Sequence, residues 1–277
     1  IDVPAFTAYA DSVILKKYTK NPVTGFTGSI AVLQDGVPVY ERHVGYGNRE
    51  QKTPLNDTTL FELASVSKQF TAVAILLLQR QGKLQLTDTI QQFFPQLPYR
   101  GITLAHLLAH TSGMPDYEKM LEQRWDRTKF ATNEDVITML GNHHPKVLFA
   151  LGTRWEYSNT GYVLLASVIE KVSGKSYGEF LKETLFTPLG MSRSRVYNTR
   201  RAGGEVLDNY AWGYVYDKQR AGYVLPDSLE KYDEVRYQDA ITGDGTVNSC
   251  LRDMEIWANE LLHPRVLPAD LPELLWR

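Results

Sequence analysis

The stretch Phe61-Glu-Leu-Ala-Ser65-Val-Ser-Lys68-Gln-Phe-Thr-Ala opens the most regular apolar pattern in the chain. Apolar residues recur from there at helical spacing, and Gly82 follows where a helix C-terminus is expected. The spacing predicts a helix over residues 65–81. Because residues three apart share one face of a helix, Ser65 and Lys68 are expected to lie side by side.

Ser65 and Lys68 are a candidate nucleophile and base. A serine hydroxyl attacks a carbonyl only when a base takes its proton, and a lysine on the same helix face can be that base. The N-terminus of the helix would stabilise negative charge on a bound carbonyl oxygen. A capping serine followed by an exposed lysine explains the same two residues equally well. The spacing alone leaves both interpretations open.

A second polar group, Tyr157-Ser158-Asn159, comes just before a long apolar helix predicted from Gly161 to about Gly174. A phenol, with a pKa of about 10, becomes a usable base only beside a cation, and Lys68 can supply that charge. The Asn159 amide can donate to a substrate carbonyl and contact the lysine. Taken separately, such residues are more often packing, turn or cap residues. The combination with Ser65 makes them candidates for a site.

The chain resembles the serine β-lactamase and penicillin-binding protein superfamily, specifically its class C-like branch, which includes D-alanyl-D-alanine carboxypeptidases and related esterases. A Y-x-N motif in place of S-D-N is typical of that branch. The stretches that carry the resemblance run in family order over nearly the whole chain: Phe61-Glu-Leu-Ala-Ser65-Val-Ser-Lys68, Leu84-Gln-Leu-Thr-Asp88, Ile102-Thr-Leu-Ala-His-Leu-Leu-Ala-His110-Thr-Ser-Gly113, Tyr157-Ser-Asn159-Thr-Gly-Tyr162, Phe186-Thr-Pro-Leu-Gly190 and Gly243-Asp-Gly245.

The resemblance implies an α+β, β-lactamase/transpeptidase-like fold, in which an antiparallel sheet is flanked by helices and joined to a helical region. It implies that Ser65 is the acylated nucleophile and Lys68 its general-base partner. Tyr157 would be the base or proton shuttle that also serves deacylation, and Asn159 would orient the substrate. How the proton is shared between Lys68 and Tyr157 stays open. This chemistry requires no metal and no organic cofactor.

The implied function is that of a serine hydrolase acting through an acyl-enzyme on an amide or ester, of penicillin-binding protein or D-alanyl-D-alanine peptidase type. The expected partner is a β-lactam, a D-Ala-D-Ala peptide or an ester. A class C-like β-lactamase and a small-ester esterase carry the same motifs, as does a catalytically silent binding or regulatory module of the same fold. Family members that act on peptidoglycan work outside the cytoplasm, which implies a periplasmic or secreted location.

Three parts are predicted along the chain. Residues 1–64 hold an N-terminal helix, predicted over residues 4–18, and a hairpin that turns at Asp35-Gly36, a dipeptide suited to the positive φ angles of a tight turn. Residues 65–200 hold the nucleophile helix and a helical region. Residues 201–277 hold a stretch rich in Tyr and Gly, then a helix leading back to the sheet.

The family's third motif, K-T-G or H-x-G, does not follow Gly245 in this sequence. In the family that motif lies on a later sheet strand, which also supplies the second donor of the oxyanion hole. The resemblance therefore predicts that the C-terminal strands are absent from these 277 residues and that the chain is part of a longer protein.

Composition excludes several other classes of protein. With 43% apolar and 22% charged residues the chain can bury a core, and its net charge of −2 gives no general field for nucleic acid or an anionic membrane. The apolar run Ala72 to Leu78 is far shorter than the ~20 residues that span a bilayer. A lone Cys250 allows no internal disulfide and no thiolate metal site, and is expected in the core.

Three further features each allow a structural and a functional interpretation. His106 and His110 have the spacing of zinc ligands, but Leu107 stands where H-E-x-x-H needs its glutamate, so structural histidines are expected. A local cluster of arginines could meet an anionic substrate group or simply be a solvated loop. The tyrosine-rich stretch over residues 203–240 could line a cleft or pack normally. The arginines are Arg193, Arg195, Arg200 and Arg201.

Overall fold

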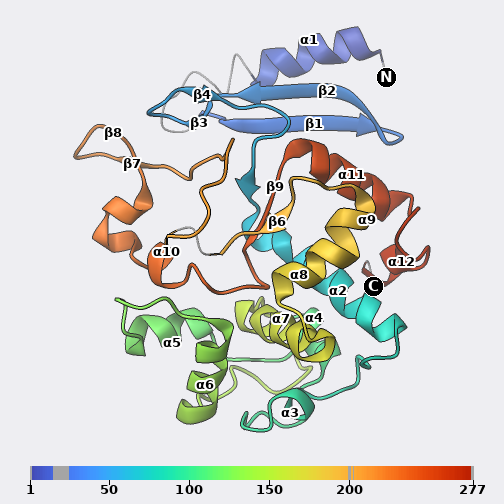
Figure 1. The fold of residues 1–277 in the computed structure, drawn as a ribbon, viewed down its shortest axis with the longest axis vertical. Coiled ribbons are helices and arrows are strands. Elements are labelled where there is room, and N and C mark those ends of the chain that lie inside the picture. Colours follow the sequence, from blue (N-terminus) through green and yellow to red (C-terminus); the bar gives the residue numbers. More distant parts are fainter. Residues whose placement is uncertain (1, 15–24, 199–200, 202, 276–277) are drawn as a thin grey trace.

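Helix α7 (Asn159–Ser173) lies in the middle of the molecule and packs against α2 (Lys68–Arg80). Every residue from 160 to 169 on α7 is buried, as expected for a helix that is apolar on all sides. The structure is a computed structural model that describes residues 2–14, 25–198, 201 and 203–275. Figure 1 shows smaller helices around this pair and the long hairpin toward one end of the molecule.

The helices around α2 and α7 are short, and several begin at a side-chain cap. Thr103 caps α4 and Thr132 caps α6, each in a reciprocal capping box. The helices are α1 (Val3–Val13), α3 (Ile90–Phe93), α4 (Leu104–Leu108), α5 (Tyr117–Arg124), α6 (Asn133–His143), α8 (Tyr177–Leu181), α9 (Thr187–Leu189), α10 (Glu234–Tyr237), α11 (Leu251–Leu262) and α12 (Leu271–Leu275).

The described strands form small antiparallel sheets rather than the single sheet expected. The hairpin is confirmed, with its turn at Asp35 and Gly36, both at positive φ. It packs against α1 and α11, and neither of its strands pairs with another described strand. The sheets are β1 (Gly28–Gln34) with β2 (Val37–Val44), β3 (Tyr46–Asn48) with β4 (Thr53–Pro54), β5 (Phe61–Glu62) and β6 (Arg195–Val196) on either side of β9 (Val247–Ser249), and β7 (Val215–Asp217) with β8 (Gly222–Val224).

The helix predicted over residues 65–81 is present, but its first turn differs. Residues Ala64–Ser67 form a tighter 3₁₀ turn before α2 begins at Lys68, and Ala64 takes a left-handed φ of 46°. The helix ends at Arg80, with Gly82 at positive φ just beyond it, as predicted. The N-terminal helix predicted over residues 4–18 is observed over Val3–Val13, and residues 15–18 lie outside the described part.

The core joins distant parts of the chain around Phe70 on α2. The ring of Trp257, from α11, lies 4.4 Å from that of Phe70, and the ring of Phe186 lies 5.5 Å from it. All three side chains are essentially fully buried. Helix α2 is therefore held in place by α11 and by the segment after α8. This packing gives the residues at the N-terminus of α2 a rigid support.

The turn at Gly243 brings the end of the chain against α2 and α7. Its φ is 101°, and a Cβ there would lie 2.4 Å from the carbonyl oxygen of Tyr162, so only glycine fits. The Thr71 hydroxyl donates to the Gly243 carbonyl at 2.6 Å. This close approach positions Asp244, the next residue, beside the start of α2. None of the described helices is both long and apolar enough to cross a membrane.

Candidate active site

The 3₁₀ turn at the start of α2 places Ser65 directly beside Lys68. Residues three apart eclipse one another in a 3₁₀ helix, and Lys68 Nζ donates to Ser65 Oγ at 3.3 Å. Ser65 is exposed, while Lys68 is only 7% exposed. The Ser65 side chain caps neither the turn nor α2, so the alternative of a capping serine with an exposed lysine is wrong.

Lys68 donates to three acceptors, which is the full set for an ammonium group. Besides Ser65 Oγ, its Nζ donates to Asn159 Oδ1 at 2.8 Å and to the backbone carbonyl of Asp244 at 2.7 Å. The acceptors come from the start of α2, the start of α7 and the turn after Gly243. Burial of this lysine is therefore compensated by three convergent oxygen atoms.

Tyr157 reaches the same serine from the other side. Its hydroxyl donates to Ser65 Oγ at 2.6 Å, and its ring centroid lies 4.9 Å from Lys68 Nζ. The side chain is 45% exposed, which is unusual for a tyrosine that serves only packing. The structure thus brings together Ser65, Lys68, Tyr157 and Asn159, the four residues that the sequence singled out.

Asn159 is held in one orientation by Glu118, a residue that sequence reasoning missed. The amide oxygen accepts from Lys68, and Nδ2 donates to Glu118 Oε1 at 2.9 Å. Burial and the charge of Asp116 raise the pKa of the Glu118 carboxyl, although the bond from Asn159 lowers it in part. The local sequence signal near Glu118 is Asp116, which caps α5 and does not indicate a contact between Glu118 and Asn159.

A buried pair lies beneath Lys68. The Tyr117 hydroxyl donates to Asp244 Oδ2 at 2.9 Å, and both residues are buried. Burial raises the pKa of the Asp244 carboxyl, opposed by the nearby charge of Lys68. Burial and the charge of Asp244 raise the pKa of Tyr117 well above its ordinary value. The floor of the site thus holds an acidic group that is not exposed to solvent.

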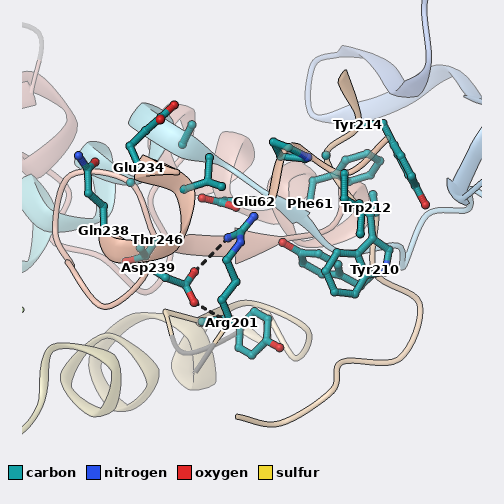
Figure 2. Close-up of a pocket in the computed structure, with 18 of the residues that line it drawn as sticks. Phe61, Glu62, Arg201, Tyr210, Trp212, Tyr214, Glu234, Gln238, Asp239 and Thr246 are labelled. Atoms are coloured by element: carbon teal, nitrogen blue, oxygen red, sulfur yellow. Dashed lines mark hydrogen bonds and ion pairs between the residues drawn. The ribbon is translucent and has the colours of Figure 1, made fainter. Parts of the chain in front are cut away.

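Ser65 opens into a pocket of about 760 Å³ whose far wall is largely aromatic. Tyr210, Trp212 and Tyr214 line one side of it, as Figure 2 shows, and Tyr223 joins them from β8. The guanidinium of Arg49 lies 3.7 Å from the centroid of the Tyr223 ring. The tyrosine-rich stretch therefore lines a cleft, one of the two possibilities that the sequence left open.

The arginine cluster does not act as a unit. Arg201 lines the pocket, where it pairs with Asp227 and Asp239 (Figure 2 shows the latter pair). Arg193 pairs with Asp208 and Arg195 with Glu205, while Arg200 lies outside the described residues.

The remaining candidates have structural environments. His106 completes the capping box at the start of α4 through Nδ1, and His110 packs beside Tyr157, so both occupy structural positions as expected. Cys250 is buried, as predicted, and burial raises the pKa of its thiol to about 11.

A serine lies between a lysine and a tyrosine at the start of a helix, and the chain belongs to the Beta-lactamase family, whose family model matches residues 19–277. Penicillin-binding protein 4* of Bacillus subtilis (strain 168) is 48% identical over 229 residues, 83% of this chain and 51% of the relative. Protein flp of Staphylococcus aureus (strain NCTC 8325 / PS 47) is 27% identical over 269 residues, 92% of this chain and 48% of the relative. The chain thus spans about half the length of these relatives.

Solved structures confirm the β-lactamase/transpeptidase-like, α+β fold. A penicillin-binding protein from Bacillus halodurans has a TM-score of 0.77 at 25% identity, over 96% of this chain and 76% of that one. D-amino acid amidase from Ochrobactrum anthropi SV3, solved with D-phenylalanine, has a TM-score of 0.73 at 28% identity, over 100% of this chain and 74% of that one. The octameric penicillin-binding protein homologue from Pyrococcus abyssi has a TM-score of 0.75 at 28% identity, over 99% of this chain and 59% of that one.

Proposed function

We propose that this chain carries the acylation site of a serine hydrolase of the penicillin-binding protein and D-alanyl-D-alanine peptidase type. The observation that carries the proposal is the exposed Ser65 Oγ, within 2.6 Å of the Tyr157 hydroxyl and 3.3 Å of Lys68 Nζ. Membership of the Beta-lactamase family and the similarity to penicillin-binding protein 4* support it. A catalytically silent module needs neither a buried lysine nor an exposed serine, and it does not need the two side by side.

In this proposal Tyr157 takes the serine proton and Lys68 stays an ammonium. The three acceptors around Lys68 Nζ match the three N–H groups of an ammonium. That charge, 4.9 Å from the Tyr157 ring, stabilises the phenolate needed to accept a proton. Lys68 therefore supplies the positive charge, and Tyr157 supplies the basic oxygen.

The acylation step then proceeds in two stages. The Ser65 proton passes to the Tyr157 oxygen as Oγ bonds to the substrate carbonyl carbon, and the carbonyl π electrons move to its oxygen. The Ser65 backbone N–H, at the start of the turn, stabilises that oxyanion. When the carbonyl re-forms, the bond to the leaving group breaks and Tyr157 returns the proton to it. The product is an ester of Ser65, which water hydrolyses with Tyr157 as base.

Substrate contacts in this proposal come from Asn159 and the aromatic wall. One N–H of the Asn159 amide is used by Glu118, which leaves the second for a substrate carbonyl. The flat faces of Tyr214 and Tyr223 suit apolar groups of a peptide or β-lactam side chain. A substrate from peptidoglycan would place the protein in the periplasm or outside the cell, and the name of the 48% identical relative supports this location.

A panel of three reagents tests the proposal. The full-length protein and its Ser65→Ala variant are incubated with a fluorescent penicillin, a chromogenic cephalosporin and a short-chain p-nitrophenyl ester. Stable labelling by the penicillin that is lost in Ser65→Ala is the expected result. Rapid turnover of the cephalosporin would indicate a β-lactamase, and turnover of the ester alone an esterase. No reaction with any reagent, or reaction that survives Ser65→Ala, would contradict the proposal.

A further inference from the structure

His110 lies in a layer of aromatic rings directly behind Tyr157. The two rings are stacked, with centroids 4.7 Å apart and planes 28° from parallel. Tyr162 covers His110 at 5.1 Å, and Trp155 meets it edge-on at 5.9 Å. The face of Tyr157 that points away from solvent is therefore supported by an imidazole rather than by an aliphatic side chain.

Hydrogen bonds attach His110 to the chain on both sides of Tyr157. The backbone N–H of Ser158 donates to His110 Nδ1 at 3.0 Å, and the N–H of Glu156 donates to the His110 carbonyl at 2.9 Å. Residues 156 and 158 are thus fixed to one residue, and the ring of 157 stacks on the same residue. These contacts oppose a rotation of the segment that would carry the Tyr157 hydroxyl away from Ser65.

His110 makes these contacts from an unfavourable backbone conformation. Its φ is 57°, in the left-handed region that residues with a Cβ rarely adopt. The conformation follows α4 and turns the imidazole toward the segment that precedes α7. Local strain at a residue that touches a candidate catalytic group is expected where the placement of that group matters.

We propose that His110 is a positioning residue that holds Tyr157 against Ser65, and that it does so only as the neutral imidazole. The inference rests on the proposed function, because it concerns the base assigned there. A neutral ring accepts the Ser158 N–H at Nδ1, whereas a protonated ring carries a hydrogen on both nitrogens and accepts nothing. Protonation therefore removes one of the two hydrogen bonds that fix the segment.

The surroundings of the ring keep it neutral at ordinary pH. Tyr162 from α7 and Tyr157 face it, and Lys68 from α2 is the charged group that acts on it. Burial, and then the charge of Lys68, lower the pKa of His110 below its ordinary value of 6.5. The contact is thus intact above that value and is lost as the pH falls through the lowered pKa. Acylation should show an acid limb for this reason.

Two variants separate the contribution of the stacked His110 ring from that of its hydrogen-bond acceptor, Nδ1. His110→Phe keeps a stacked ring but removes the acceptor, and should lower the rate of acylation by a penicillin about 10- to 100-fold, since a small misplacement of a reacting group has effects of this order. Its apparent binding constant should change less than about threefold. His110→Asn places Oδ1 near the position of Nδ1 and tolerates positive φ, so it should acylate within about tenfold of the wild type and lose the step of the acid limb that follows the protonation of His110.

His144 supplies the matched control. It also has a left-handed φ, 47°, but is exposed at the end of α6. His144→Phe and His144→Asn should leave the acylation rate and its pH profile unchanged. If His110→Phe acylates as fast as the wild type, or if His110→Asn keeps the wild-type acid limb, the positioning role is wrong. The pH profile of His110→Asn keeps the test available should the Phe variant fail to fold.

An NMR titration separates this inference from the proposed function. The Ser158 amide signal should shift with the protonation of His110 in the wild type, with a midpoint below 6.5, and should not titrate in His110→Asn. A Ser158 amide that titrates in a protein which no penicillin acylates would contradict the proposed function. It would also contradict a role in catalysis for the contact between His110 and Ser158. Acylation at Ser65 with a Ser158 amide that does not respond to His110 would contradict the inference alone.

Discussion

The two walls of the pocket differ in how they are held. On one wall, Lys68 is buried and bonded to three oxygen atoms that come from separate parts of the chain. The opposite wall is built from residues 210–214, which precede the three-residue strand β7, and from the partly exposed Tyr223 on the three-residue strand β8. The difference teaches that reacting groups are placed on the core, whereas contacts to the distal part of a substrate lie on surface segments.

The largest effect is expected when the charge of Lys68, on the first wall, is removed. Lys68→Met keeps the length of the side chain but removes the ammonium that, in the proposed mechanism, stabilises a Tyr157 phenolate. The rate of acylation by a penicillin should fall about 10²- to 10⁴-fold, the usual range for general acid–base groups. Stopped-flow or gel-based labelling measures that rate.

Lys171→Met, on α7, is the control for the same substitution. Lys171 donates to the Phe93 carbonyl at the surface and lies outside the pocket lining, so its variant should acylate normally. A Lys68→Met protein that acylates within tenfold of the wild type would contradict the assigned role of the charge.

The second test concerns how tightly the rigid wall is packed. Gly243→Ala would place a Cβ 2.4 Å from the Tyr162 carbonyl and 2.5 Å from Ala166 Cβ, and would force a positive φ on alanine. Overpacking and strain together should lower the free energy of unfolding by about 3 kcal/mol or more. Urea denaturation followed by circular dichroism measures the loss.

Gly174→Ala is the matched control, because Gly174 also has positive φ but nothing lies within 4 Å of the new Cβ. It should lose only about 1–2 kcal/mol from backbone strain. Equal losses in the two variants would show that the turn at Gly243 is not packed as described.

The residues of the candidate site differ in how well the sequence predicts their contacts. Ser65, Lys68, Tyr157 and Asn159 belong to short motifs with fixed spacing, so their proximity could be predicted. The contact between Glu118 and Asn159 could not, because it arises from the way α5 approaches α7 and leaves no local pattern. The catalytic roles of all five stay proposals that the variants test.

Local structure was predictable where one periodicity extends over several turns. The hairpin around Asp35-Gly36 and the helix after Gly161 have such patterns, and both are present. Three-residue strands such as β7 are too short to show alternation, so the tyrosine-rich stretch could not be assigned. The 3₁₀ turn at Ala64 depends on a left-handed alanine, which no propensity would place there.

The third test perturbs the aromatic wall. Tyr223→Ala removes one aromatic face of the pocket, which in the proposal contributes about 1 kcal/mol of contact with an apolar group of the substrate. The apparent binding constant for a penicillin should rise about fivefold, while the maximal acylation rate stays within about twofold of the wild type. Acylation rates measured over a range of penicillin concentrations give both constants.

Tyr9→Ala, at an exposed position on α1, is the control and should change neither constant. A fall in the maximal rate of Tyr223→Ala would mean that the aromatic wall also positions the reacting groups. The division between the two walls would then be wrong.

The smallest effect is expected at Glu118, on the border between the walls. Its pKa is raised in the folded protein, mainly by burial, so the folded chain binds more protons than the unfolded chain just above the ordinary value of 4.5. The free energy of unfolding contributed by this group therefore falls as the pH rises through that window. Glu118→Gln should be slightly more stable than the wild type at pH 7, with a difference that vanishes below pH 4.5.

Thermal denaturation of both proteins at several pH values measures this difference. Glu122→Gln, on the exposed side of α5, is the matched control for the substitution itself. A wild-type protein that is more stable than Glu118→Gln at neutral pH would contradict the expected direction of the effect.

The central claim is that Ser65 is the residue that becomes acylated, and mass spectrometry tests it directly. The full-length protein is incubated with benzylpenicillin, its intact mass is measured, and proteolytic peptides are sequenced to locate the adduct. A mass gain of one penicillin, confined to the peptide that contains Ser65 and absent from Ser65→Ala, is the predicted result. An adduct on any other residue, or a wild-type protein that gains no mass, would contradict the account.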